Sequence, residues 1–210
     1  MKNKYVWVID AGHGGLKDGV YTTPPHLGKF KTFEDGFTIY EGVVNRAIAK
    51  LLYQRLQLEG IDFVLCYHDV EDWPLRKRVQ ITHNVYKKNK NIVLLSIHSN
   101  AGGGRGNEVF TSIGQNASDS IADVFCQAYQ KHFVEWPFRS CRVDGDGDKE
   151  ANFRVLMSLN DKKKPAPYPA VLVETLFFDV RLQAELLMNE DFQLRVADCF
   201  ADAILSIATL

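Results

Sequence analysis

The apolar residues of this chain fall into two patterns that alternate along the sequence. Short continuous runs, several rich in β-branched residues, predict strands that are buried on both faces, as in parallel sheets; these are Val6–Ile9, Ile61–Tyr67, Ile92–Ile97, Glu108–Ser112 and Ala170–Val173. Longer stretches with apolar residues three and four positions apart predict helices; these are Glu41–Glu59, Pro74–Lys88, the segment after Ser118, Val180–Met188 and Phe192–Ile207. Strands that alternate with helices predict an α/β fold with a mostly parallel sheet.

Local signals refine the helices and the loops between them. Pro74 stands where a proline of the first turn belongs, and Leu75 then faces inward together with Val79 and Val85. Ser118 is expected to cap the following helix through its hydroxyl group. Polar and glycine-rich or proline-rich stretches predict loops; they cover residues 14–38, 136–150 and 161–169.

The composition changes this picture little, but it excludes some classes. A chain of 210 residues suits one domain, here residues 1–210, and 46% hydrophobic with 24% charged residues is ordinary for a globular protein. The formal net charge of −1 gives no argument for a nucleic-acid partner. No apolar stretch approaches the ~20 residues that a membrane-spanning helix needs, so membrane insertion is not expected.

The N-terminal residues do not resemble a secretory signal. Lys2 and Lys4 are followed by an apolar run of only Tyr5–Ile9, which is better interpreted as the first strand. We therefore expect cytoplasmic synthesis, or removal of an exporting segment. The four cysteines lack CxxC spacing, and we expect Cys66, Cys126 and Cys199 to be buried without a disulfide framework.

Two histidines follow strand-like runs and are poorly placed for packing in a core. His13 stands in Asp10-Ala-Gly-His-Gly-Gly15, and His98 is flanked by serine and asparagine. The carboxyl ends of parallel strands meet at one edge of a sheet, where ligands bind. Because neutral imidazole is the commonest zinc ligand, the pair favours a metal site. The glycines around His13 could instead bind a phosphate, although neither GxGxxG nor GK[ST] is present.

Two glutamates are candidates for the remaining roles. Glu41 opens a predicted helix and could be a third ligand, or a carboxylate that the helix dipole favours; Asn45, one turn later, could hold it in place. Glu174 closes an apolar strand, and the apolar residues after it would raise its pKa and suit it to proton transfer. A structural carboxylate in a salt bridge is the alternative for Glu174.

Taken together, these motifs resemble those of a known enzyme family. Asp10-Ala-Gly-His13-Gly-Gly, Glu41-x-x-x-Asn45, Ser96-Ile-His98-Ser-Asn-Ala101 and Pro169-Ala-Val-Leu-Val-Glu174 are similar to the motifs of zinc-dependent N-acetylmuramoyl-L-alanine amidases of the amidase-3 family, in the same order. The resemblance implies that His13, Glu41 and His98 bind Zn²⁺ and that Glu174 is the catalytic carboxylate. It also implies a twisted, mostly parallel sheet flanked by helices on both faces.

The chain departs from the family pattern in two places. The interval between His13 and Glu41 is longer than is common, as if residues 20–38 were extra, and Thr175-Leu-Phe-Phe-Asp179 replaces the usual Gly-Phe sequence after the glutamate. Four aromatic residues and two prolines in the 20–38 stretch lead us to expect a wall of the substrate groove. The alternative is that these aromatics pack on the flank of the domain.

The expected function is hydrolysis of the amide bond between N-acetylmuramic acid and L-alanine in peptidoglycan. The expected partner is peptidoglycan, through its glycan strand and stem peptide. We expect the protein to be a monomer and to act on the cell wall as a phage-type lysin or a delivered effector, or in the periplasm if a leader was removed. The alternatives are an inactive peptidoglycan-binding module and a zinc peptidase of carboxypeptidase type. A calcium loop at Asp144–Asp148 is not expected, because Lys149 and Val155 stand where an EF-hand needs glycine and glutamate.

Overall fold

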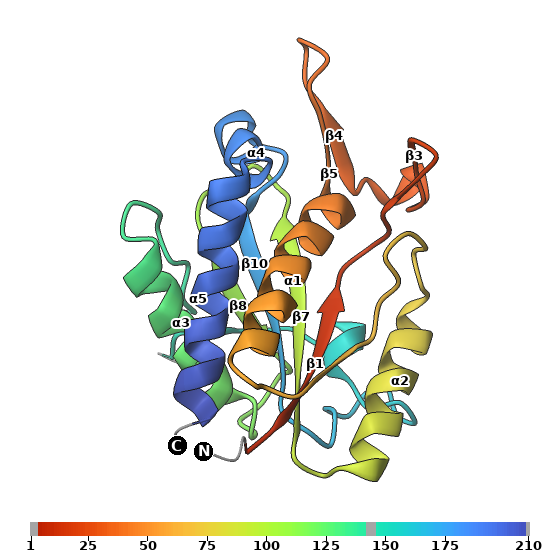
Figure 1. Cartoon of the computed structure of the whole chain (residues 1–210), viewed down its shortest axis with the longest axis vertical. Helices are drawn as coiled ribbons and strands as arrows, with labels where there is room; N and C mark the ends of the chain where they lie inside the picture. Colours follow the sequence, from red (N-terminus) through yellow and green to blue (C-terminus); the bar gives the residue numbers. More distant parts are fainter. Residues whose placement is uncertain (1–3, 142–145, 209–210) are drawn as a thin grey trace.

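The fold is built around one twisted sheet of six strands (Figure 1). The structure is a computed structural model, and it describes residues 4–141 and 146–208. The order of the strands across the sheet is β6 (Phe63–Leu65), β1 (Val6–Ala11), β7 (Ile92–Asn100), β10 (Ala170–Phe177), β8 (Glu108–Thr111) and β9 (Lys149–Glu150). The first four strands are parallel, β8 runs antiparallel to β10, and β9 is parallel to β8.

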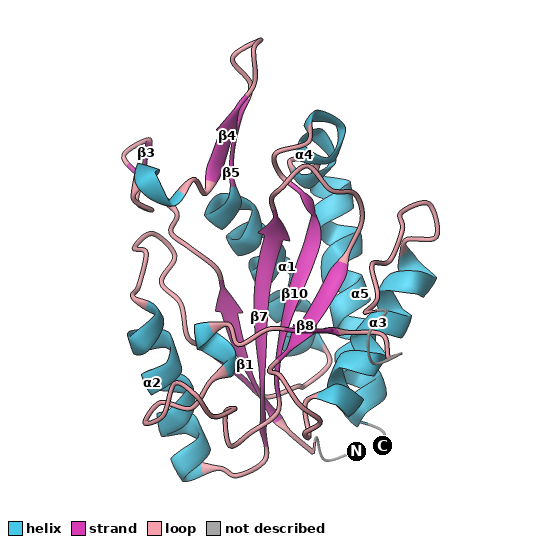
Figure 2. Cartoon of the chain, turned by 180° about the vertical axis from the view of Figure 1, so that it is seen from behind, coloured by secondary structure: helices cyan, strands magenta, loops and turns pink. Residues whose placement is uncertain are grey.

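Helices cover both faces of this sheet (Figures 1 and 2). On one face lie α1 (Glu41–Leu58), α3 (Asp119–His132) and α5 (Glu190–Ala208), and on the other lie α2 (Leu75–Lys88) and the short 3-10 helix η2 (Arg154–Leu156). The short helix α4 (Arg181–Leu187) follows β10. The predicted fold, an α/β domain with a mostly parallel sheet and helices on both faces, is confirmed.

Alternate residues of each central strand enter different cores. In β1, Trp7 and Ile9 pack into the larger apolar cluster under α1, α3 and α5, whereas Val8 packs into the smaller one under α2. All three side chains are fully buried. Because successive side chains point to opposite faces, a strand covered on both sides needs an apolar residue at every position. This is why continuous apolar runs marked the strands in the sequence.

The parallel arrangement brings the polar ends of three strands to one edge. Asp10 of β1 lies in register with Ser96 of β7, and His98 of β7 lies in register with Glu174 of β10. The hairpins that follow β1 rise from the same edge at the top of Figure 1, while both termini lie at the opposite end. The polar motifs of the sequence therefore meet at the carboxyl edge of the sheet, as expected.

The stretch 14–38, predicted as a loop, contains two hairpins instead. One joins β2 (Leu16–Lys17) to β3 (Val20–Tyr21), and the other joins β4 (Phe30–Thr32) to β5 (Thr38–Tyr40), with the 3-10 helix η1 (Pro25–Leu27) between them. The turn of the first hairpin is Asp18-Gly19, with φ of 50° and 80°. An Asp-Gly pair in this conformation matches the twist of a two-residue hairpin, and this local signal was missed.

Three further predictions about local structure were wrong. Leu75 is 50% exposed rather than inward. Pro74 is the N-cap of α2 rather than a residue of its first turn. Ser118 makes no capping bond; its hydroxyl oxygen accepts the backbone N–H of Ala170 at 3.1 Å instead, because β10 passes beside it.

Strand β10 also continues beyond Glu174, where the sequence analysis ended it. The register with β7 shifts between Glu174 and Phe177, and Leu176 adopts a φ of 53°. Such a bulge bends a strand and redirects the side chains around it. The Asn107 side chain accepts the N–H of Leu176 at 3.1 Å, which stabilises the irregular backbone.

The burial of the cysteines and the character of the described helices agree with what the composition led us to expect. Cys66, Cys126 and Cys199 are buried, as predicted. Across residues 4–141 and 146–208, no helix is both long enough and apolar enough to cross a bilayer. Part of the Asp144–Asp148 motif lies outside the described residues.

Candidate metal centre

His13 lies in a backbone turn directly after β1, held in an unusual conformation. Its φ is 64°, a left-handed value that costs a residue with a side chain free energy. The carbonyl oxygen of His13 accepts hydrogen bonds from Arg46 Nη2 at 2.6 Å and from Arg78 Nη2 at 2.7 Å. Two guanidinium groups therefore fix this turn from opposite elements, α1 and α2.

The Arg78 side chain is the buried centre of a wider network. It is 2% exposed, and its Nη1 donates to Asp10 Oδ1 and to the Ala11 carbonyl, both at 2.6 Å. Its Nη2 also reaches Asp72 Oδ1 at 3.1 Å, and Ser96 donates to the second oxygen of Asp10 at 2.7 Å. Burial alone would raise the pKa of Asp10, but the charge of Arg78, the nearby His98 and the hydrogen bonds from Arg78 and Ser96 together outweigh it and lower that pKa.

Arg46 ties the N-terminal turn of α1 to the same segment. Its Nη1 donates to the Gly42 carbonyl at 2.8 Å and to the Gly12 carbonyl at 3.2 Å, while Nε donates to the His68 carbonyl at 3.0 Å. Burial and the nearby Arg78 lower the pKa of Arg46 to about 10. The sequence analysis missed both arginines. The feature that could have indicated them is an arginine on the apolar face of each predicted helix. A charged side chain in such a position needs a buried partner.

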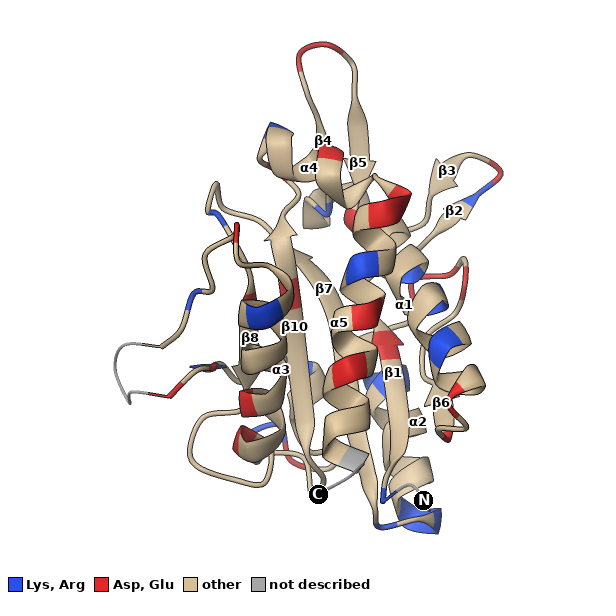
Figure 3. Ribbon diagram, turned by 60° about the vertical axis from the view of Figure 1, so that its left-hand side comes forward, with Lys and Arg blue, Asp and Glu red and all other residues tan. Residues whose placement is uncertain are grey.

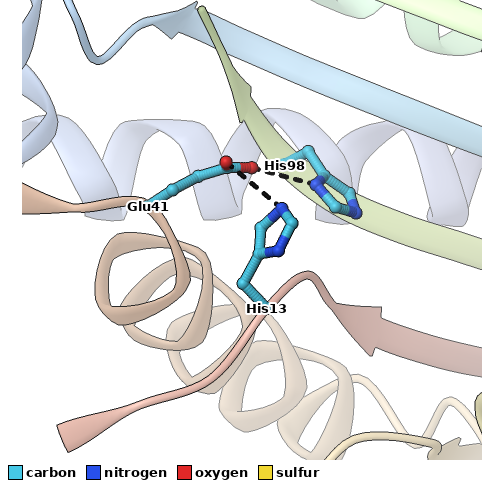
Figure 4. Close-up of side chains that lie close together, drawn as sticks. All are labelled: His13, Glu41 and His98. Atoms are coloured by element: carbon cyan, nitrogen blue, oxygen red, sulfur yellow. Dashed lines mark hydrogen bonds and ion pairs between the residues drawn. The ribbon is translucent and has the colours of Figure 1, made fainter. Parts of the chain in front are cut away.

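Glu41 begins α1 and lies between the two histidines, as Figure 4 shows. Its carboxylate is 1% exposed; Oε1 is 3.0 Å from His98 Nδ1, and Oε2 is 3.2 Å from His13 Nε2. The two imidazole rings meet edge to face at 5.1 Å between centroids. Asn45 Nδ2 lies 3.5 Å from Glu41 Oε1 and 3.4 Å from the Gly12 carbonyl, matching the positioning contact expected from the sequence.

Two glycines allow this close approach. A Cβ at Gly12 would lie 2.1 Å from His98 Cε1, so the imidazole of His98 rests directly on the Gly12 backbone. A Cβ at Gly42 would lie 2.1 Å from the Gly14 carbonyl oxygen. Any side chain at either position would push His98 or the start of α1 away from the centre.

The donor set fits a divalent zinc ion. The candidate ligand atoms of His13, Glu41 and His98 all lie within 4.8 Å of one another. Two imidazoles and a carboxylate are the protein ligands of one type of catalytic zinc site. The buried His13 Nε2 and Glu41 Oε2 form no hydrogen bond of good geometry within the described chain, although they are 3.2 Å apart.

The protonation states also suit a cation. Burial lowers the pKa of His13, which keeps its imidazole neutral and able to act as a ligand. Burial would raise the pKa of Glu41, but the two imidazoles outweigh it and keep that pKa well below its usual range. For His98, burial is outweighed by the carboxylate of Glu41, and the pKa is raised.

Glu174 lies next to this centre but forms no hydrogen bond with the Glu41 carboxylate. It faces His98 across β7 and β10, and its Oε2 is buried without a hydrogen-bond partner in the described chain. Burial, with a smaller contribution from the charge of Glu41, raises the pKa of Glu174 to about 8. A buried carboxyl with such a pKa beside a metal centre can accept and donate a proton near neutral pH.

A cavity of about 470 Å³ opens beside the two histidines. Its walls include Pro24, Leu27 and Lys29 from the 20–38 stretch, and Trp73 and Leu75 from the start of α2. The aromatics of that stretch mostly pack against one another or the core: Tyr21 and Phe30 each contact Tyr40, and Phe33 contacts Phe37. The stretch thus borders the cleft through its aliphatic and basic residues rather than through its aromatics.

Comparison with known proteins places this geometry in a family. The family model described as N-acetylmuramoyl-L-alanine amidase matches residues 8–206. Comparison with curated proteins gives no match. Among solved structures, the catalytic domain of CwlV from Bacillus (Paenibacillus) polymyxa var. colistinus is 27% identical, with a TM-score of 0.72 over 96% of this chain and 97% of that one.

Two other solved structures are similar over nearly their whole length. An N-acetylmuramoyl-L-alanine amidase from Clostridium difficile 630 is 25% identical, with a TM-score of 0.73 over 98% of this chain and 97% of that chain. The amidase AmiC2 of Nostoc punctiforme, 23% identical with a TM-score of 0.69, covers 99% and 98% and supports the fold. The resemblance stated from the motifs is confirmed by the family match.

The buried ion pair gives a prediction about stability. Arg78→Leu should lower the free energy of unfolding by about 3–5 kcal/mol at pH 7, because it leaves the Asp10 carboxylate buried without its partner. Chemical denaturation followed by circular dichroism measures this loss. Arg76→Leu, at an exposed position of the same helix, should change stability by only about 0.5 kcal/mol.

The loss should also depend on pH with a defined sign. In the native chain the pKa of Asp10 is below its ordinary 3.8, so its contribution is present above that pH and disappears as the pH falls through the lowered pKa. Without Arg78, burial raises that pKa, and stability then declines as the pH rises from about 4. The difference in free energy of unfolding between the native and Arg78→Leu proteins should therefore increase from acid to neutral pH. A difference that does not change with pH contradicts this account.

Proposed function

The chain belongs to the N-acetylmuramoyl-L-alanine amidase family, and we propose that it uses zinc, held by His13, Glu41 and His98, to cleave the bond between the lactyl group of N-acetylmuramic acid and L-alanine. Its enzyme class is that of the family, an amide hydrolase of peptidoglycan. The observation that carries the zinc proposal is the convergence of three ligand atoms within 4.8 Å, from three separate segments, beside a buried carboxyl.

When bound, a zinc ion polarises the scissile carbonyl, activates the attacking water and lowers the pKa of a neighbouring carboxyl group. The residues of the chain do the rest. Glu174 accepts the proton of the attacking water and then donates it to the nitrogen of the leaving amine. Its unpaired, buried Oε2 is the atom suited to this transfer, because no competing hydrogen bond must be broken.

The surrounding residues orient the reacting groups. Arg46 and Arg78 hold the His13 carbonyl, and Asn45 lies against the Glu41 carboxylate, so the ligands need little reorganisation to bind the ion. Pro24 and Leu27 give one side of the cleft an apolar wall. We propose that the chain acts on the cell wall as a single catalytic domain and as a monomer.

The two alternative functions are less well supported. An inactive binding module would have no need of a buried, unpaired carboxyl next to a complete ligand set, since an unpaired buried group costs stability. A carboxypeptidase would act at the far end of the stem peptide and release a single amino acid. The products of the reaction distinguish all three functions.

Mass spectrometry of purified peptidoglycan treated with the protein tests the reaction. We expect stem peptides that begin with a free L-alanine, together with glycan chains that retain the lactyl carboxyl group. Treatment with a chelator should abolish their release, and added zinc should restore it. Release of a C-terminal amino acid would favour the carboxypeptidase, and binding without any product would favour the inactive module.

The ligand assignment predicts which substitutions remove the metal. His13→Ala and His98→Ala should each lower the zinc content of the purified protein from about one ion per chain to near zero, because two ligands do not hold a catalytic zinc well. Elemental analysis after dialysis measures this. The matched control is His83→Ala, on the outer part of α2, which should retain full zinc. Full zinc in the double variant His13→Ala/His98→Ala would overturn the assignment.

The role of Glu174 predicts a different outcome. Glu174→Gln should retain zinc and thermal stability, yet lower kcat by roughly 10²–10⁴-fold, because the amide cannot carry the proton. Turnover of a soluble muropeptide, measured together with zinc content, separates the two effects. Loss of zinc in this variant would make Glu174 a ligand, and nearly normal turnover would move the proton transfer to another residue.

A further inference from the structure

A second cavity, of about 510 Å³, lies beyond Glu174 and is lined by basic residues. Three of its six lining residues are Arg105, Arg139 and Lys149; Pro137, Phe138 and Ser140 complete it. They come from the loop after β7, the segment after α3 and the first residue of β9. Figure 3 shows basic positions on the loops that run beside β8 and β10.

The sheet register places this cavity relative to the reaction centre. Glu174 lies opposite His98 on one side and opposite Glu108 on the other. Side chains in register on neighbouring strands share a face, and strands are 4.7–4.9 Å apart, so Glu108 lies about 10 Å from His98. His98, Glu174 and Glu108 thus form a row across the sheet edge, and Glu108 stands at the border of the basic cavity.

The cavity carries an excess of positive charge. Glu108 is 3% exposed, and its Oε1 accepts from Lys149 Nζ at 2.7 Å and from Arg139 Nε. Its Oε2 accepts from Asn100 Nδ2 at 2.8 Å. Glu108 thus pairs with Arg139 and Lys149, and Arg105 adds a third cation to the lining of the cavity. An anion with planar oxygens would balance the remaining two charges.

An aromatic ring lies against each of the two guanidinium groups. Arg105 lies over the ring of Trp136 at 5.0 Å, and Arg139 lies over the ring of Phe177 at 5.4 Å. A ring orders a guanidinium group through its π electrons and adds no formal charge. The N–H groups at the edge of each guanidinium can then form a bidentate interaction with a carboxylate. The cavity is thus preorganised for an anion.

The direction of the proposed reaction indicates what that anion is. Glu174 returns its proton to the leaving amine, so the amine half of the substrate lies on the Glu174 side of the metal ligands. The glycan half then lies toward the more apolar cavity of Pro24 and Leu27. An extended peptide rises 3.3–3.6 Å per residue, so about 10 Å corresponds to roughly three residues beyond the scissile bond. The second residue of a peptidoglycan stem is D-glutamate linked through its γ-carboxyl, which leaves its α-carboxyl free.

We propose that Arg105, Arg139 and Lys149 form a subsite that binds a free carboxylate on the second or third residue of the stem peptide. This inference rests on the proposed function, because it uses the direction of the amide cleavage. The subsite would make the protein selective for stems with ionised carboxylates over stems in which those groups are amidated.

Matched substrates test the subsite. The substrates are three muramoyl tripeptides with amidated C-termini: one with D-glutamate at residue two, one with D-isoglutamine there, and one with D-isoglutamine and a diamino acid whose side-chain carboxylate is free. We expect the zinc-loaded enzyme to cleave at least one acidic substrate with a kcat/KM about tenfold above that of the neutral substrate, mainly through a lower KM. Equal values for all three would overturn the subsite.

The protein variants complete the test. Arg105→Gln/Lys149→Gln leaves Arg139 to neutralise Glu108, and should bring the kcat/KM values of the acidic and neutral substrates to within about twofold of each other. Lys131→Gln/Lys163→Gln, which removes the same charge at exposed distant positions, should keep the preference. A preference that survives in the first variant, or disappears in the second, contradicts the proposal.

A binding measurement separates this inference from the proposed function. The peptide L-alanyl-D-glutamine, whose α-carboxylate is free and whose γ-carboxyl is an amide, is titrated into the native chain without added zinc. It should shift the NMR signals of Arg105 and Arg139, whereas the same peptide with its α-carboxyl amidated should not. Failure of the native zinc-loaded enzyme to cleave any substrate refutes the proposed function. Cleavage with no acid preference and no shift at these arginines refutes only the subsite.

Discussion

The Arg78 guanidinium, buried beneath the metal-binding turn, is the interaction on which the arrangement of the centre depends. A charge in this position must be fully paired, and Arg78 meets that requirement with Asp10, Asp72 and the backbone carbonyls of Ala11 and His13. The same bonds that satisfy the arginine set the path of the chain from the end of β1 to the first candidate ligand. Hydrogen bonds from this guanidinium and from Arg46 to the His13 carbonyl stabilise the left-handed backbone of His13.

The second element of the centre is electrostatic. Glu41 is almost completely buried and would be costly as an isolated charge, yet its pKa is low because two imidazoles face it. The start of α1 adds the positive end of the helix dipole. Glu174, in register with His98, has a raised pKa mainly because it is buried, and its Oε2 has no hydrogen-bond partner in the described chain. Two carboxyls at one sheet edge thus have opposite tendencies, one suited to a ligand and one to proton transfer.

The cleft also differs between its two sides, because different elements build them. Toward β1, the 20–38 stretch and the segment that leads into α2 contribute largely aliphatic and aromatic walls. Toward β8, the loops around α3 contribute arginine and lysine side chains over aromatic rings. The antiparallel strand β8 makes this second side possible, since it brings Glu108 into register with Glu174. A substrate with one sugar half and one charged peptide half matches such a polarity.

The sequence by itself predicted the order of the main strands and helices along the chain, the α/β class and the candidate residues His13, Glu41, His98 and Glu174. A strand buried on both faces must be apolar throughout, so polar motifs such as Ser96-Ile-His98 stand out at its end. The tertiary structure alone decided which distant groups meet. Arg46 and Arg78 contact carbonyls more than 30 residues away in the sequence, and no local pattern records such pairs. The exposure of Leu75, the bulge after Glu174 and the basic cavity likewise depend on neighbouring elements. The reason is that burial and charge pairing are properties of packed surfaces, whereas periodicity reports only the shape of a single segment.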